Sequence, residues 1–192
     1  YGIDISADGS NITAVDRRNV YFFDKSSSTE VWNKNFATQE MATASISPDG
    51  RYVAAGTFDG NVYVFLTSDA DDVWFHSDAL DGKITDLEFS GDSSHLIIGT
   101  DSGRVHVYSS LGGDPVTMFQ PDTVSCVSAG ANSKYYIYGT EGGMLTLFDG
   151  TIGADIWQKN IGGDVSDCVF NGKGTYVFAG SDNKKIVLAN VT

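Results

Sequence analysis

Four acidic side chains recur in this chain at a nearly constant interval, each within a short polar segment rich in Gly, Ser or Asn. They are Asp59, Asp101, Glu141 and Asp182. Repeated carboxylates of this kind could stabilise tight turns, which is the favoured interpretation, or could form an acidic surface that attracts a basic partner. Phe58 stands out because it places an apolar ring where the other repeats have Asp, Glu or Arg. An exposed aromatic ring is a typical contact residue, so we expect partner binding at Phe58 and at these carboxylates.

The residues that could support catalysis or bind a metal are few and scattered. The histidines are His76, His95 and His106, and the densest acidic run holds Asp69, Asp71 and Asp72. The histidines lack the close spacing of metal ligands, and the acidic run lacks the Gly and terminal Glu of a calcium loop. A G-x-S-x-G nucleophile motif is also missing from the sequence. We therefore predict no enzyme activity, no catalytic residue, no metal site and no cofactor.

Two cysteines and two glycosylation sequences complete the set of reactive residues. Cys126 and Cys168 fall in corresponding strands of neighbouring repeats but one position out of register. Side chains alternate between the faces of a strand, so we expect two buried free thiols rather than a disulfide. Asn11 and Asn190 each begin an N-x-T sequence and are possible glycosylation sites.

The composition limits the classes of partner. The chain has 192 residues, 12 basic and 25 acidic side chains and a net charge of −13. Such a charge repels phosphate backbones and anionic lipid, so we predict no nucleic-acid partner. No segment approaches the roughly 20 apolar residues of a membrane span, so we predict no membrane insertion. The 22 glycines and 3 prolines indicate an ordered domain with many tight turns.

One segment recurs along the whole chain. ISPDGRYVAAG at 46–56 matches FSGDSSHLIIG at 89–99, AGANSKYYIYG at 129–139 and FNGKGTYVFAG at 170–180, and more loosely ISADGSNITAV at 5–15. The last residues of these segments are spaced by 41, 43, 40 and 41 positions. Self-similarity at a fixed period of this size is typical of a propeller or a solenoid.

Each repeat contains four short apolar runs, and their alternation is that of strands. In VHVY at 105–108, for example, apolar and polar positions alternate, and Asp59-Gly60 in the preceding repeat is a hairpin turn signal. The sequence therefore predicts an all-β propeller of four-stranded antiparallel blades, with units starting near residues 1, 41, 83, 123 and 164. The last unit ends after its third strand, which makes about 4.75 blades in a single domain spanning 1–192.

A closed ring usually has roughly six to eight blades. We therefore expect this domain to be part of a larger ring that is completed by missing sequence or by another chain.

The blade sequences resemble two families of propeller repeats. SPDGRYVAAGTFDGNVYVF and SGDSSHLIIGTDSGRVHVY resemble WD-repeat blades, whereas LFDGTIGADIWQKN at 147–160 and STEVWNKN at 28–35 resemble quinoprotein-type (PQQ-like) repeats. The third strands lack the Trp-Asp pair of WD repeats, and the Gly-His pair before the first strand is also missing. The chain is thus most similar to a divergent, prokaryotic type found in envelope or secreted proteins. Trp32, Trp74 and Trp157 hold equivalent positions in three units, which favours blade packing over a unique cofactor site.

The resemblance implies a non-catalytic module that binds protein partners through its loop faces, or a structural module of the cell surface. An extracellular or envelope location is the favoured one. A cytoplasmic WD-repeat scaffold is the first alternative, and a fragment of a quinoprotein-type dehydrogenase is the second.

Overall fold

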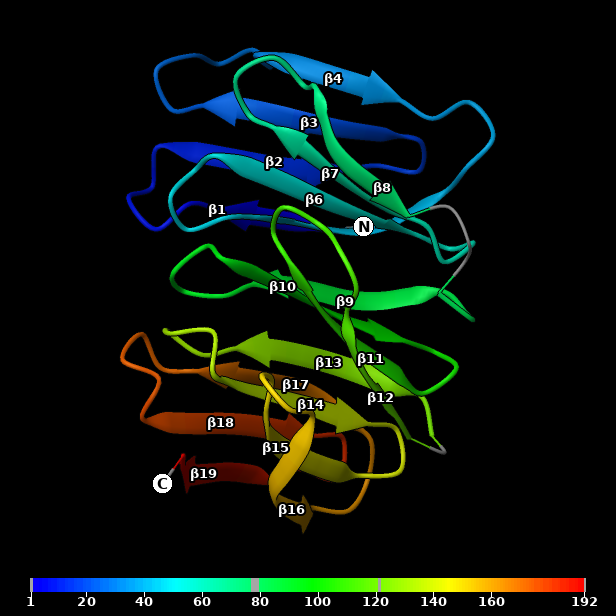
Figure 1. Cartoon of the computed structure of the whole chain (residues 1–192), viewed down its shortest axis with the longest axis vertical. Helices are drawn as coiled ribbons and strands as arrows, with labels where there is room; N and C mark the ends of the chain where they lie inside the picture. The colour runs from blue at the N-terminus through cyan, green and yellow to red at the C-terminus, as the bar shows by residue number, and fades with distance from the viewer. Residues whose placement is uncertain (1, 77–79, 121, 192) are drawn as a thin grey trace.

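The fold consists of consecutive antiparallel sheets stacked side by side as blades, shown by a computed structural model (Figure 1). The structure describes residues 2–76, 80–120 and 122–191. Four sheets have four strands and the fifth has three, so the predicted β-propeller architecture of about 4.75 blades is confirmed. Tyr1, at which the first unit was expected to begin, lies outside the described residues. Across the described ranges we find no helix with the length and apolarity that crossing a bilayer requires.

The strands follow one another in chain order within every blade. Blade 1 contains β1 (Ile3–Ile5), β2 (Asn11–Val15), β3 (Asn19–Asp24) and β4 (Trp32–Asn35). Blade 2 contains β5 (Met41–Ile46), β6 (Tyr52–Thr57), β7 (Val62–Leu66) and β8 (Asp72–His76). Blade 3 contains β9 (Ile84–Phe89), β10 (His95–Thr100), β11 (Arg104–Ser109) and β12 (Val116–Phe119). Blade 4 contains β13 (Val124–Ala129), β14 (Tyr135–Thr140), β15 (Met144–Asp149) and β16 (Ala154–Asn160). Blade 5 contains β17 (Val165–Phe170), β18 (Tyr176–Ser181) and β19 (Ile186–Asn190).

The hydrophobic core lies between the blades rather than within any one of them. Each of four apolar clusters combines facing side chains of two neighbouring blades, as Val62 and Val64 of blade 2 do with Ile84 and Leu87 of blade 3. A single sheet cannot bury its apolar face alone, so stacking supplies the core that each repeat lacks.

A glycine near the end of the second strand sets how closely two blades approach. A Cβ atom at Gly56 would lie 2.5 Å from Ile84 Cγ2, and one at Gly99 would lie 2.7 Å from Val124 Cγ1. Real Cβ atoms do not come that close to other atoms, so these positions require glycine. The β-branched side chain of the next blade fills the space that the glycine leaves open.

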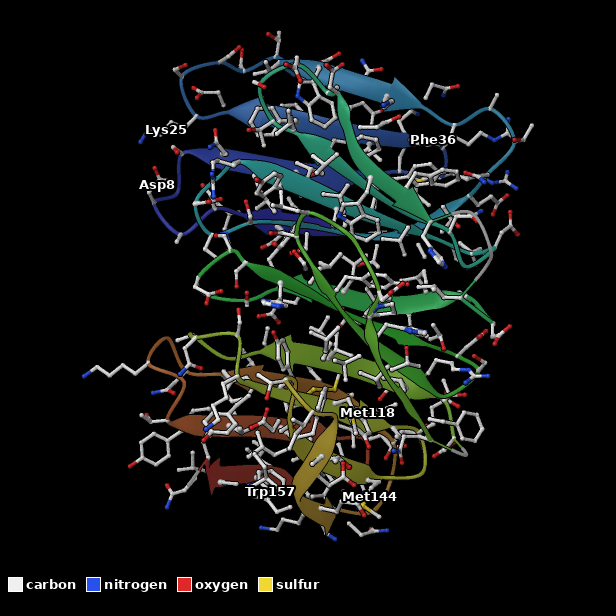
Figure 2. The ribbon with its side chains drawn as sticks, viewed as in Figure 1. Asp8, Lys25, Phe36, Met118, Met144 and Trp157 are labelled. Carbon is white, nitrogen blue, oxygen red and sulfur yellow. A yellow bond between two sulfur atoms is a disulfide. The ribbon has the colours of Figure 1, made fainter. Side chains whose placement is uncertain are left out.

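The three tryptophans fasten blades to their neighbours, as the sequence predicted. The indole N–H of Trp32 donates to the Thr67 carbonyl (2.8 Å), that of Trp74 to Ser110 (3.0 Å) and that of Trp157 to Asn190 (3.3 Å). Each acceptor belongs to the blade that follows. Figure 2 shows Trp157 on β16, the fourth strand of blade 4, beside β19 of blade 5. A partly buried indole that finds such a partner contributes both buried area and a directed hydrogen bond.

The expectation of two free thiols is wrong. Cys126 on β13 and Cys168 on β17 form a disulfide with their Cα atoms 6.0 Å apart. Neighbouring blades pack face to back, so opposite faces of equivalent strands meet at each interface. A one-position offset in register therefore brings the two side chains together instead of separating them. The bond links the innermost strands of blades 4 and 5.

Candidate protein-binding rim

The turns between the second and third strands of blades 2 to 5 share one conformation, and we call them the rim turns. They cover residues 57–61, 100–104, 140–144 and 181–185. In each, the fourth residue has a positive φ (Gly60 80°, Gly103 81°, Gly143 81°, Lys184 67°). Its N–H donates back to the residue that ends the second strand, as Gly60 does to the Thr57 carbonyl at 3.2 Å. Glycine adopts this conformation without steric cost, which explains the repeated turn sequence.

The second residue of every rim turn is also held by the loop that enters its blade. The amides of Phe58, Asp101, Glu141 and Asp182 donate to the carbonyls of Glu40, Lys83, Thr123 and Asp164 at 2.9, 3.0, 3.0 and 3.0 Å. The structure therefore places Phe58, Asp101, Glu141 and Asp182 at equivalent positions on one face of the array. Asp59 lies one residue further along its turn.

The four predicted carboxylates differ in their bonding. Asp101 Oδ1 accepts a hydrogen bond from the Lys83 amide at 2.9 Å, which is the turn-stabilising role that the sequence favoured. Within the described part of the chain, the carboxylates of Asp59, Glu141 and Asp182 make no hydrogen bond or ion pair, and all three residues are exposed. These three are therefore available to a partner.

Phe58 is half exposed, at 45% of its accessible area. The Lys83 ammonium lies over its ring, 4.3 Å from the centroid. A cation on an exposed aromatic face is stabilised by roughly 0.5–1 kcal/mol. The pair thus gives the rim one amphipathic contact point beside its carboxylates.

A second set of acids lies on the same face and was not singled out from the sequence. It consists of Glu40, Asp81, Asp122 and Asp164, in the loops that enter blades 2 to 5. Glu40 pairs with Arg17, and Asp81 pairs with Arg104 at 3.0 Å. Among the described residues neither Asp122 nor Asp164 has an ion pair, but the Asp122 carboxylate accepts hydrogen bonds from the amides of Thr123 (2.9 Å) and Gly142. Their recurrence once per repeat was the signal that could have found them.

Unpaired negative charge is therefore concentrated on blades 4 and 5. We call Asp122, Glu141, Asp164 and Asp182 the acidic rim; Lys184 and Lys185, in the last rim turn, offset part of its charge. A hollow of about 240 Å³ lies next to it. Its lining consists of Gln120, Asp122, Thr140, Gly142, Met144 and Gln158. Met144, labelled in Figure 2, lies at the start of β15.

The other candidate residues do not form a site. His106 is buried, its Nδ1 lies 2.9 Å from Thr117 Oγ1, and burial lowers the pKa of its imidazole to about 4. Asp69 accepts a bond from the Asp71 amide, whereas Asp72 pairs with Lys34 of blade 1. Over the described ranges, no three His, Cys, Asp or Glu side chains are grouped to hold a metal ion.

The two glycosylation sequences lie in different surroundings. Asn11 is the first residue of β2, and its Nδ2 lies 2.5 Å from where a Cβ on Gly50 would be. Asn190 is exposed at the end of β19. Modification of either residue stays a prediction.

Carboxylates on the innermost strands tie one blade to the next. Asp4 Oδ2 accepts hydrogen bonds from Ser45 Oγ (2.8 Å) and the Ile46 amide (2.9 Å), and Asp86 Oδ2 accepts one from the Val127 amide (2.9 Å). Glu88 lies on β9 beside Asp86. Burial, reinforced by the nearby Asp86 charge, raises the pKa of the Glu88 carboxyl to about 8.

The raised pKa of Glu88 makes folding stability depend on pH. The folded chain holds the Glu88 proton up to a pH of about 8, whereas the unfolded chain releases it near 4.5. The stabilisation is therefore complete below that lower value and is lost as the pH rises to the higher one. We expect Glu88→Gln to change Tm by less than about 1 °C at pH 4 and to raise it by about 4 °C or more at pH 9. Calorimetry of both chains at the two pH values checks this, and an equal shift at both would contradict it.

Comparisons with known proteins point to WD repeats. The model of the anaphase-promoting complex subunit 4 WD40 domain matches residues 44–132, and the model of the WD domain, G-beta repeat matches residues 158–189. An uncharacterized WD repeat-containing protein of Schizosaccharomyces pombe is 34% identical over 85 residues, which are 43% of this chain and 14% of that protein. These matches support the WD-repeat β-propeller family. They give no support to the quinoprotein-like or prokaryotic part of the expectation.

Two solved structures share the fold. A chain in the crystal structure of a mitotic checkpoint complex superposes with a TM-score of 0.85 at 15% identity, covering 98% of this chain and 59% of that one. The β-propeller domain of Cps50 (Swd1) from Myceliophteria thermophila gives a TM-score of 0.84 at 12% identity, covering 100% of this chain and 67% of that one. At these identities the likeness shows the fold alone. The chain spans about three fifths to two thirds of the length of these neighbours.

Proposed function

We propose that this chain, a β-propeller whose blades match WD-repeat models, is a non-catalytic scaffold that binds a basic segment of a protein partner on its rim. The observation that carries the proposal is the acidic rim. Four carboxylates that make no ion pair with any described residue lie on one face of blades 4 and 5. Two are on rim turns and two are on the entering loops, and repeated backbone hydrogen bonds join these turns to the loops. In such folds the strands form a rigid scaffold, and the exposed loops usually carry the binding residues.

The rim suits a lysine- or arginine-rich partner in both charge and shape. Carboxylates on neighbouring turns attract extended basic segments over several residues. Met144 gives the adjoining hollow an apolar part on which the aliphatic stem of a lysine can pack. Phe58 adds a second contact point two blades away.

The WD-repeat matches are consistent with the scaffold alternative. A cell-surface role receives no support from them. One part of the mitotic checkpoint complex has the same fold and lies within a multiprotein assembly, which agrees with a role in protein binding.

A charge-neutralising variant tests the rim. We expect Glu141→Gln/Asp164→Asn/Asp182→Asn to weaken binding of fluorescein-labelled octalysine about tenfold, because each exposed charge pair contributes up to about 1 kcal/mol. Fluorescence anisotropy at about 0.1 M salt, where the Debye length is near 10 Å, measures the affinity.

The matched control changes the net charge equally but elsewhere. Glu30→Gln/Asp71→Asn/Asp114→Asn removes three exposed acids that lie off the rim turns. This variant is expected to change the affinity by less than about twofold. Equal losses in the two variants would show that octalysine follows net charge alone and would overturn the assignment to the rim.

The second part of the proposal concerns the ring. We propose that the five blades described are completed by additional polypeptide, in the same chain or another, to form a closed propeller. The three-stranded fifth blade supports this, because β19 has no strand on its outer side in the described residues (Figure 1). Native proteins rarely leave such an edge bare.

A further inference from the structure

The face of blade 5 that points away from blade 4 carries exposed apolar side chains, and we call it the open face. Phe178, Ile186 and Leu188 on this face have exposed fractions of 43%, 85% and 57%. Their equivalents 41 positions earlier are Ile137, Leu145 and Leu147. All three equivalents are 0% exposed, because they pack against blade 5. The open face therefore repeats a surface that is core one blade earlier.

We infer that the open face seats a further blade of the same kind, whose first strand presents a β-branched side chain, Val or Ile, to Gly180. The inference rests on the ring completion proposed above and specifies the residue that must arrive there.

The interfaces already present show why the arriving side chain is β-branched. Gly56 faces Ile84 and Gly99 faces Val124, whereas a Cβ on Gly139 would lie 2.6 Å from Val165 Cβ. In blade 1 the corresponding residue is Val15, and the side chain that arrives in the same cluster is the unbranched Met41. Within this chain, glycine is thus paired with a β-branched residue and valine with a flexible one. Because the open face carries glycine at this position, Gly180, we expect a β-branched residue to pack against it.

We call the space over Gly180 the slot, and it corresponds to the space over Gly139 that Val165 fills. No described residue fills the slot. A Cβ placed on Gly180 would have no described heavy atom within 4 Å. A shallow hollow of about 240 Å³ lies over it, bordered by Val169, Phe178 and Ile186. At Gly139, Val165 occupies the equivalent space.

Polar groups beside the slot match the backbone of an arriving strand. Asp86 Oδ1 accepts the Leu87 amide and its Oδ2 accepts the Val127 amide of the next blade, both at 2.9 Å. Asp167 is the equivalent of Asp86, and its Oδ1 likewise accepts the Cys168 amide (2.8 Å). In the described chain its other oxygen has no partner, so it can accept an amide from a strand seated on the open face.

A serine hydroxyl offers the second backbone contact. Ser125 Oγ donates to the carbonyl of Val165, the β-branched residue of the next blade, at 2.6 Å. Ser166 lies 41 positions later and is exposed. An apolar slot, a serine donor and an aspartate acceptor at the spacing of a blade interface thus select a blade strand rather than an apolar peptide in general.

An extended chain tests the inference. Residues 1–190 followed by a second copy of residues 150–190 supply a fourth strand for blade 5 and three strands of a further blade, with a copy of Val165 over Gly180. We expect the Tm of this chain to rise by about 5 °C or more, since the open face becomes core. We also expect amide exchange in β19 to slow at least about tenfold.

Substitutions at two positions, Gly180 and the copied Val165, distinguish the inference about the slot from ring completion. Gly180→Val is expected to leave the Tm of the 192-residue chain unchanged, which shows that it folds, but to remove at least half of the gain in the extended chain. Changing the copied Val165 to Met is expected to reduce the gain, and changing it to Ile to preserve it. A full gain with Gly180→Val would overturn the inference while leaving ring completion intact.

The remaining outcomes concern ring completion itself. An extended chain with no gain and unprotected β19 amides would contradict both statements. Light scattering of the 192-residue chain identifies the other occupant: a dimer that Gly180→Val disrupts would mean that a second copy, rather than a further blade, covers the open face.

Discussion

Loss of the Cys126–Cys168 bond is expected to lower the free energy of unfolding by about 4 kcal/mol and Tm by about 10 °C. The two residues are 42 positions apart, so the bond closes a long loop and removes many conformations from the unfolded chain. Both side chains are buried at the innermost contact between blades 4 and 5. Thermal unfolding with and without a phosphine reductant measures the effect.

The double variant Cys126→Ala/Cys168→Val is the control. Valine is the residue that blade 4 has at the position equivalent to Cys168, namely Val127. The variant is expected to melt at the Tm of the reduced chain and to be insensitive to reductant. Under denaturing conditions without reductant, the native chain is expected to show no thiol that reacts with a disulfide reagent. Two reactive thiols would mean that the bond is not formed.

Gly139→Ala is expected to destabilise the chain by about 3 kcal/mol, at the upper end of the range for overpacked cores. The added Cβ would overlap Val165 of blade 5 and lie 2.8 Å from Cys126 Sγ. Both neighbours are fixed to strands, and Cys126 is also held by the disulfide. Relief of the overlap with Val165 therefore requires blades 4 and 5 to move apart. Chemical unfolding monitored by tryptophan fluorescence measures the loss.

The equivalent glycine of blade 5 provides the matched control. Gly180→Ala makes the same chemical change where the described structure has open space, so its effect is expected to stay within about 1 kcal/mol and to be stabilising. The double variant Gly139→Ala/Val165→Met should recover part of the loss, because Val15 and Met41 form this kind of pair between blades 1 and 2. Equal losses of stability at Gly139 and Gly180 would show that the destabilisation arises within the strand itself and not from overlap with the next blade.

The blades were predictable because their signals are local and repeat. Strand alternation and the Asp59-Gly60 turn define one hairpin, and the spacing from Gly56 to Gly180 repeats it along the chain. The packing of one blade on another is not encoded in any single repeat. Cys126 and Cys168 were therefore assigned to opposite faces, correctly for isolated strands, although adjacent blades bring those faces together.

The candidate site was predictable in position but not in charge. The period placed Asp101, Glu141 and Asp182 on equivalent turns, and the structure holds them there through the same backbone bonds. Ion pairing depends on side chains from neighbouring blades, so the sequence could not show which acids are neutralised. Asp81 pairs with Arg104, 23 positions away, whereas Asp164 makes no ion pair in the described chain.

The most direct test of a rim-binding scaffold is to map where a basic probe contacts the chain. An octalysine peptide with a photo-reactive group, crosslinked at low salt and located by mass spectrometry, reports the contact residues. We predict crosslinks concentrated in 120–123, 140–144, 161–164 and 181–185, with loss of this pattern in the triple rim variant. Crosslinks concentrated in the loop at 110–115 or along β8 and β16, and unchanged in that variant, would contradict the proposed function.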